Sequence, residues 1–163
     1  MHTENVIKMQ ASPALVFSLA ADIARWPLLL PHYRWVTVLE ERPDERVAEM
    51  AARRGPFPVK WTSVQRLFPE QGRITYHHLR GITTGMRVEW QLSACHGGTW
   101  VVILHDLTPN SWLLRLRLPT RIMRDFFVRS IAHQTLHHLR RVAEAEEAQQ
   151  RHYEHASLRT KAA

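Results

Sequence analysis

Residues 22–42 decide the fold, and they read Asp22-Ile-Ala-Arg-Trp26-Pro27-Leu-Leu-Leu-Pro31-His-Tyr33-Arg-Trp-Val-Thr-Val-Leu-Glu-Glu-Arg42. An apolar turn broken by two prolines leads there straight into a β-rich segment. Each proline lacks an amide donor and restricts the residue before it, so a helix in this turn ends after about two turns. Upstream, Ser12 is a good N-cap and Pro13 a good first helical residue, which predicts a helix from Ser12 to Ala21. The order is therefore strand, helix, short helix, strand.

The middle of the chain has the pattern of a ladder of strands. We predict them at Val47–Arg54, Val59–Leu67, Arg73–Arg80, Met86–Ala94 and Trp100–Asp106. Turn sequences rich in Gly, Pro and Asp separate these segments. Because the links are short, neighbouring strands are expected to be antiparallel.

The last long element is predicted to be a helix from about Leu118 to Gln150. Apolar residues recur in it at spacings of three to five, as one buried helical stripe requires. These residues are Phe127, Ile131, Leu136, Leu139 and Val142. We expect residues 1–150 to form a single ligand-binding domain, and the polar residues 151–163 to form a disordered tail.

Composition agrees with one globular domain. The chain has 163 residues, of which 45% are apolar, enough to bury a core. Cys95 is the only cysteine, so neither a disulfide framework nor a thiolate metal cluster is expected. We find neither a signal sequence nor a run of apolar residues long enough for a membrane span, and we expect a cytoplasmic protein.

The charge balance is basic, with 22 Lys plus Arg against 15 Asp plus Glu and a net charge of +7. A solvated Arg-rich surface is the favoured interpretation, and an acidic partner remains open. No zinc-finger, RNP-like or Gly-rich phosphate motif is present, so nucleic acid is not an expected partner. Residues 111–119 mix apolar residues with Arg and fit either a packed connection, which we favour, or an anionic membrane surface.

Eleven histidines raise the question of a metal site. Adjacent residues point to opposite faces of a strand and diverge by about 100° on a helix, so neither His77-His78 nor His137-His138 can chelate one ion alone. His133 and His137 have ligand-compatible helical spacing, but no zinc signature accompanies them. We expect surface histidines and no metal.

With this order of elements, an α+β fold is expected. The most specific features are the opening His2-Thr3-Glu4-Asn5, the Trp26-Pro27 turn leading to Tyr33, Arg66, Trp90 and the final helix. In these features the chain resembles the polyketide cyclase/dehydrase proteins of the START and Bet v 1-like superfamily, over roughly residues 3–146. The resemblance implies the helix-grip fold, in which a curved seven-stranded antiparallel sheet surrounds a long C-terminal helix and encloses an apolar cavity.

Strand parity and the resemblance together select Arg66. One face of its strand carries Lys60, Thr62, Val64 and Arg66, and the other carries Val59, Trp61, Ser63, Gln65 and Leu67. If the first face lines the cavity, Arg66 lies within it and, as the resemblance implies, stabilises an enolate. The alternative is an ion pair with a carboxylate such as Glu49, and the two remain open.

The resemblance implies two further catalytic residues and a set of lining residues. Tyr33 would be a general acid, and His105, which we expect to titrate near neutrality, would be the base. His105 can equally be a hydrogen-bonded sheet residue. Trp26 and Trp90 are expected as cavity walls or as plain core. The remaining expected substrate-binding residues are Thr62, Val64, Val88, Phe127 and Ile131.

Two functions follow from the resemblance. The leading one is an aromatase/cyclase that promotes regiospecific aldol cyclisation and dehydration of a poly-β-ketone chain, without a cofactor and with an acyl carrier protein as a partner. The alternative is a carrier of a quinone or lipid without chemistry. An enzyme needs converging polar groups inside the cavity, whereas a carrier needs apolar walls and one or two orienting donors. Either a monomer or a homodimer is compatible with the sequence.

Overall fold

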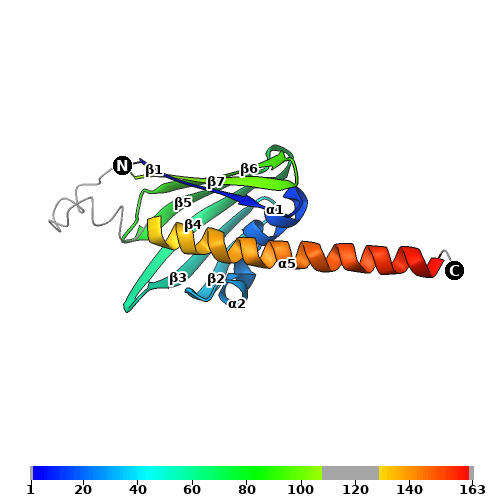
Figure 1. Cartoon of the computed structure of the whole chain (residues 1–163). Helices are drawn as coiled ribbons and strands as arrows, with labels where there is room; N and C mark the ends of the chain where they lie inside the picture. Colours follow the sequence, from blue (N-terminus) through cyan, green and yellow to red (C-terminus); the bar gives the residue numbers. More distant parts are fainter. Residues whose placement is uncertain (1, 108–128, 162–163) are drawn as a thin grey trace.

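A curved antiparallel sheet with one long helix across its concave face makes up the molecule (Figure 1). The computed structural model describes residues 2–107 and 129–161. This arrangement is the helix-grip α+β fold, which confirms the predicted fold class. The strands are β1 (His2–Met9), β2 (Tyr33–Arg42), β3 (Glu45–Arg54), β4 (Phe57–Phe68), β5 (Arg73–Gly81), β6 (Arg87–Cys95) and β7 (Gly98–Asp106). The bounds of β3 to β7 lie within two residues of the predicted ones.

The strand order is β1-β7-β6-β5-β4-β3-β2, and every neighbouring pair is antiparallel. Strands β2 to β7 follow one another as hairpins, whereas β1 pairs with the last strand, from His2 opposite Asp106 to Met9 opposite Thr99. The two edges of the sheet are therefore β1 and β2. The chain between them must cross from one edge to the other.

Two short helices and a single helical turn make that crossing. Helix α1 (Pro13–Ala21) begins where Ser12 Oγ accepts a hydrogen bond from the Leu15 amide at 3.4 Å, and Pro13 is its first residue, as predicted. The 3-10 turn η1 (Ile23–Arg25) leads into α2 (Trp26–Leu29), which ends before Pro31. A further 3-10 turn, η2 (Pro69–Gln71), links β4 and β5. The proline-limited helix puts the buried Trp26 beneath the concave face.

Helix α5 (Arg129–Lys161) covers the opening of the sheet. Leu136, Leu139 and Ala143 are fully or almost fully buried, which confirms the predicted stripe at these two leucines. The expected start at Leu118 lies outside the described residues. The expected end at Gln150 was wrong, because the helix continues to Lys161 and projects beyond the sheet (Figure 1). Residues 151–161 are therefore helical, not the disordered tail expected from their polarity.

The helix stripe generates a stability prediction. Leu139→Ala should lower the free energy of unfolding by about 2 to 5 kcal/mol, because it deletes a side chain with 0% exposure in the core. Leu28→Ala is the matched control, since Leu28 is 85% exposed, and it should cost less than about 0.5 kcal/mol. Urea unfolding of the two variants and the wild type measures both values. Equal losses in the two variants would contradict the placement of α5.

Candidate functional site

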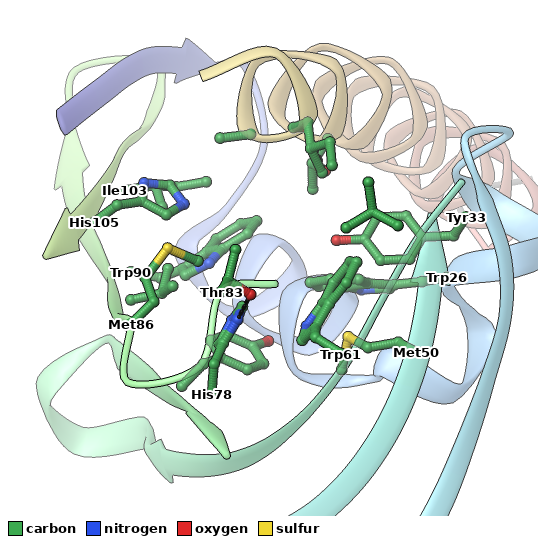
Figure 2. Close-up of a pocket in the computed structure, with 16 residues that line it drawn as sticks. Trp26, Tyr33, Met50, Trp61, His78, Thr83, Met86, Trp90, Ile103 and His105 are labelled. Carbon is green, nitrogen blue, oxygen red and sulfur yellow. Dashed lines mark hydrogen bonds between the residues drawn. The ribbon is translucent and has the colours of Figure 1, made fainter. Parts of the chain in front are cut away.

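A cavity of about 80 Å³ lies between the concave face of the sheet and the N-terminal turns of α5. Strands β2 to β7, α2, α5 and the β5–β6 turn all contribute to its wall, and Figure 2 shows their side chains directed toward a common space. The lining residues are Trp26, Tyr33, Met50, Val59, Trp61, Tyr76, His78, Thr83, Met86, Val88, Trp90, Ile103, His105, Ile131, Ala132 and Thr135. None of these lining residues carries a full charge unless a histidine is protonated.

Arg66 does not lie in this cavity, so its predicted catalytic role was wrong. Its Nε donates to a Glu45 carboxylate oxygen at 2.7 Å on the outer face of the sheet, and 59% of its side chain is exposed. Glu45 is directly opposite Arg66 in the β3–β4 register. The ion-pair alternative therefore holds, with Glu45 in place of the expected Glu49. Glu49 instead accepts from Lys60 at 2.8 Å.

The error was one of strand register. The cavity side of β4 carries Val59 and Trp61, and the next two residues of the same parity, Ser63 and Gln65, are fully buried. Because side chains alternate along a strand, choosing the other set moves every residue to the wrong face. Thr62 and Val64 belong to the set of Arg66 and do not line the cavity, so their predicted substrate contacts were also wrong. Phe127 lies outside the described residues.

Other expected residues do line the cavity, and their role in binding stays a prediction. Trp26 lies among three aromatic rings, with centroid distances of 4.9 Å to Tyr33, 6.0 Å to Trp90 and 6.3 Å to Tyr76. The indole Nε1 of Trp26 donates to the Leu19 carbonyl at 3.1 Å, which fixes the ring. Val88 and Ile131 complete the expected set. A wall of closely packed, mutually inclined aromatic rings suits a flat, conjugated ligand.

Tyr33 belongs to a polar group at the helix side of the cavity. Thr135 Oγ1 donates to the Ile131 carbonyl at 2.8 Å and lies 2.9 Å from Nε2 of His32. Since that hydroxyl has one proton, His32 donates through Nε2, and burial lowers the pKa of His32 to about 4. Burial raises the pKa of Tyr33, and its hydrogen bond with Thr135 offsets this only in part. Tyr33 therefore keeps its proton at neutral pH.

His105 lies in the cavity wall, but it does not titrate where we expected. Only 6% of it is exposed, and burial lowers its pKa to about 4, against the opposing effect of the Asp106 carboxylate. The imidazole is therefore neutral at pH 7, and the expectation of a pKa near neutrality was wrong. Its Nδ1 is buried and has no hydrogen-bond partner among the residues that the structure describes. The cavity wall thus contains a buried imidazole nitrogen without a partner, among mostly apolar groups.

His78 is a cavity residue that the sequence analysis missed. It was taken for a surface histidine, although the argument that His77 and His78 face opposite ways was right: His77 is exposed and His78 is buried. The His78 ring stacks on Trp61 at 5.7 Å with an interplanar angle of 7°, and its Nδ1 lies 2.6 Å from Thr83 Oγ1. The alternation of Ile74, Tyr76 and His78 on one strand face was the signal that could have identified it.

The described residues also bear on metals and membranes. Across 2–107 and 129–161, no three His, Cys, Asp or Glu side chains lie close enough together to hold a metal ion. His133 and His137 have ring centroids 4.2 Å apart on α5, as their spacing predicted, and no third ligand joins them there. No helix in the described part of the chain is long and apolar enough to cross a membrane.

Comparisons with known proteins agree with this architecture. The model of the family "Polyketide cyclase / dehydrase and lipid transport" matches residues 9–140. A bifunctional cyclase/dehydratase of the actinorhodin polyketide synthase of Streptomyces coelicolor is 28% identical over 104 residues, which are 63% of this chain and 33% of that protein. The chain thus spans about a third of the length of this curated relative.

Solved structures show the fold at lower identity. The Zhui aromatase/cyclase from Streptomyces sp. R1128 is 21% identical, with a TM-score of 0.75 over 88% of this chain and 93% of that chain. A START superfamily protein from Mycobacterium smegmatis is 16% identical, with a TM-score of 0.67 over 91% of this chain and 97% of that chain. The resemblance noted from the sequence is confirmed.

The buried histidines generate a pH prediction. The pKa values of His32, His78 and His105 are lowered from 6.5, so the unfolded chain binds more protons below pH 6.5 and stability falls as the pH is lowered from 6.5 toward 4. A lowering to about 4 corresponds to roughly 3 kcal/mol per residue. Urea unfolding across this range should show a smaller loss in His78→Gln than in wild type. His77→Gln, at the exposed neighbouring position, is the control, and its stability should fall with pH as much as that of wild type.

Proposed function

Because the chain belongs to the polyketide cyclase / dehydrase and lipid transport family, we propose that it folds a poly-β-ketone chain in its cavity and promotes an intramolecular aldol condensation followed by loss of water. The observation that carries the proposal is the presence of a protonated phenol, Tyr33, and an unpartnered imidazole nitrogen, that of His105, in the wall of one cavity. A buried polar atom without a partner is costly, and a ligand that satisfies it removes that cost.

The two residues have complementary parts in this chemistry. A methylene group between two ketones gives a proton to Nδ1 of His105, and the enolate carbon then bonds to a second carbonyl carbon. The oxygen of that carbonyl becomes an alkoxide and takes the Tyr33 proton. In the loss of water, the Tyr33 phenolate takes a proton from the neighbouring carbon and the new hydroxyl leaves with the His105 proton, so both side chains return to their starting protonation states. All steps are redox-neutral, so no cofactor takes part in this proposal.

The low pKa of His105 makes it a weak base in the empty cavity. A negatively charged enolate beside the ring favours the imidazolium by charge attraction, which raises its pKa in the complex. Much of the rate enhancement would come from holding the flexible chain in a reactive curl against the aromatic wall. Arg66 has no part in this mechanism, because it is ion-paired on the outer face.

A carrier function is the second candidate, and one observation favours it. No residue in the cavity wall has a pKa near neutrality: the lining histidines have values of about 3 and 4, and burial raises the pKa of both tyrosines. Proton transfer at pH 7 is easiest for groups that titrate near that pH. A quinone or lipid would need only the apolar walls and one or two donors.

Either ligand must widen the cavity. A volume of about 80 Å³ is well below the roughly 300 to 1,000 Å³ of drug-sized ligand sites. Met50 and Met86 both lie in the wall, and the unbranched side chain of methionine adapts readily to a new shape. For the enzyme, we propose delivery of the chain on an acyl carrier protein, whose acidic surface would suit the net charge of +7.

Product profiling tests the enzyme proposal. A reconstituted polyketide synthase receives wild type, Tyr33→Phe, Arg66→Ala or no protein, and the cyclised products are measured by mass spectrometry. Tyr33→Phe keeps the ring but loses the proton donor, and it should reduce the cyclised product by about 10²- to 10⁴-fold, the usual worth of acid–base catalysis. Arg66→Ala should match the wild type. Identical profiles in all four samples would leave ligand binding as the function.

A second prediction concerns occupancy of the cavity. Ala132 lines it from α5, so Ala132→Phe should fill the space and abolish both ligand binding and any cyclisation. Ala145→Phe on the same helix is the matched control, because Ala145 is exposed, and it should leave binding unchanged. Calorimetric titration with a polyaromatic ligand, after a check of thermal unfolding, compares the two. Undiminished binding by Ala132→Phe would place the ligand elsewhere.

A further inference from the structure

We propose that His78, held by Thr83 and Trp61, is the group through which the cavity recognises a neutral ligand oxygen, that of a ketone or of its enol or phenol form. The inference rests on the proposed function in that a ligand must enter the cavity. It adds a specific contact, which neither Tyr33 nor His105 supplies, and a chemical class of ligand atom.

The turn between β5 and β6 fixes the His78 ring. Gly81 (φ 102°) and Gly85 (φ 86°) adopt backbone conformations that side-chain-bearing residues rarely reach, so the turn can fold back on the strand. The Gly85 amide donates to the His78 carbonyl at 2.8 Å, and the His78 amide donates to the Met86 carbonyl at 2.9 Å. Thr83, which is 5% exposed, is thereby held beside Nδ1 of His78.

One ring nitrogen is left for a ligand. Nδ1 is occupied by Thr83, and the stacking on Trp61 sets the plane of the ring (Figure 2). Within the part of the chain that the structure describes, Nε2 has no hydrogen-bond partner. Its neighbour across the β4–β5 register, Ser63, is fully buried, and the Ser63 hydroxyl is also without a partner among the described residues.

Another buried polar pair on the same two strands shows the contrast. Gln65 Nε2 donates to the Ala21 carbonyl and to Tyr76 Oη, both at 3.0 Å, so these groups hold α1 against the sheet. The His78 side chain, by contrast, is hydrogen-bonded only to Thr83 in its own turn among the described residues, and its contact with Trp61 is ring stacking. A buried imidazole nitrogen without a partner destabilises the fold, and a Phe at this position would not have that cost. A ligand atom that bonds to Nε2 removes the cost.

The charge state sets the class of ligand atom. Burial lowers the pKa of His78 to about 3, with nearby His105 and His77 acting in the same direction, so the ring is neutral. None of the groups facing it in the cavity wall is permanently charged. A neutral imidazole nitrogen donates to a ketone or accepts from an enol or phenol, according to its tautomer. A carboxylate or phosphate would enter without a cation to pair with it.

Two probes of equal size test the contact. 1-Naphthol carries a hydroxyl where 1-methylnaphthalene carries a methyl group, so the ratio of their affinities isolates the oxygen. Isothermal titration calorimetry should show a preference of wild type for 1-naphthol. His78→Phe, which keeps the aromatic stack, should lose about tenfold in 1-naphthol affinity, the worth of one buried hydrogen bond, and keep its affinity for 1-methylnaphthalene.

Two amide variants distinguish the role of Nδ1 from that of Nε2, and they replace His78→Phe as the test if that variant fails to fold. His78→Asn can still reach Thr83 but not the cavity, and it should behave as His78→Phe does. His78→Gln reaches the place of Nε2 and should retain a preference for 1-naphthol. His77→Asn, on the opposite face, should match wild type.

The outcomes distinguish the two proposals. If wild type and every His78 variant bind both probes with the same preference, the role of His78 is overturned, while the cavity remains a ligand site. If wild type binds neither probe, the binding step of the proposed function fails, and the inference fails with it.

Discussion

The gap between α5 and the concave face of the sheet is the constraint on which the rest of the structure depends. Near its N-terminus, the helix presents the small residues Ala132 and Thr135 to the sheet, and the space beneath them stays open as the cavity. Further along, Leu136 and Leu139 are buried and close the core. Beyond the sheet the helix has nothing to cover and it projects outward (Figure 1), with residues 148–154 exposed. One helix thus covers the cavity, completes the core and projects beyond the sheet.

The composition of the cavity limits the kind of chemistry it supports. On the outer face, Arg66 and Lys60 are largely exposed and each is paired with a partly exposed carboxylate. Inside, two imidazoles and two phenols are all neutral at pH 7, since burial disfavours their charged forms. Such a site offers directional hydrogen bonds without a fixed charge. The cavity therefore suits a neutral substrate whose negative charge exists only in a short-lived intermediate.

The sequence predicted the fold well because glycines, prolines and periodic apolar residues set the strand and helix bounds. It failed on β4, where both faces mix polar and apolar residues: Lys60, Thr62 and Val64 on one, Trp61, Ser63 and Gln65 on the other. With that pattern, the alternation of side chains divides the strand into two sets of residues, but it does not show which set faces the cavity. The lowered pKa of His105 depends on burial by distant elements, which no local pattern encodes. The far end of α5 has good helix-forming residues, but we judged it by its polarity instead.

The aromatic wall also has an optical consequence. Of the six tryptophans in the chain, Trp26, Trp61 and Trp90 line the cavity beneath α5, and they are almost fully buried. Their emission arises in an apolar, rigid environment, while that of the 43% exposed Trp100 arises largely in water. A conjugated guest that absorbs in the near ultraviolet would sit against these three indoles and take up their excitation energy. The protein thus carries an intrinsic fluorescent indicator of whether its interior is filled.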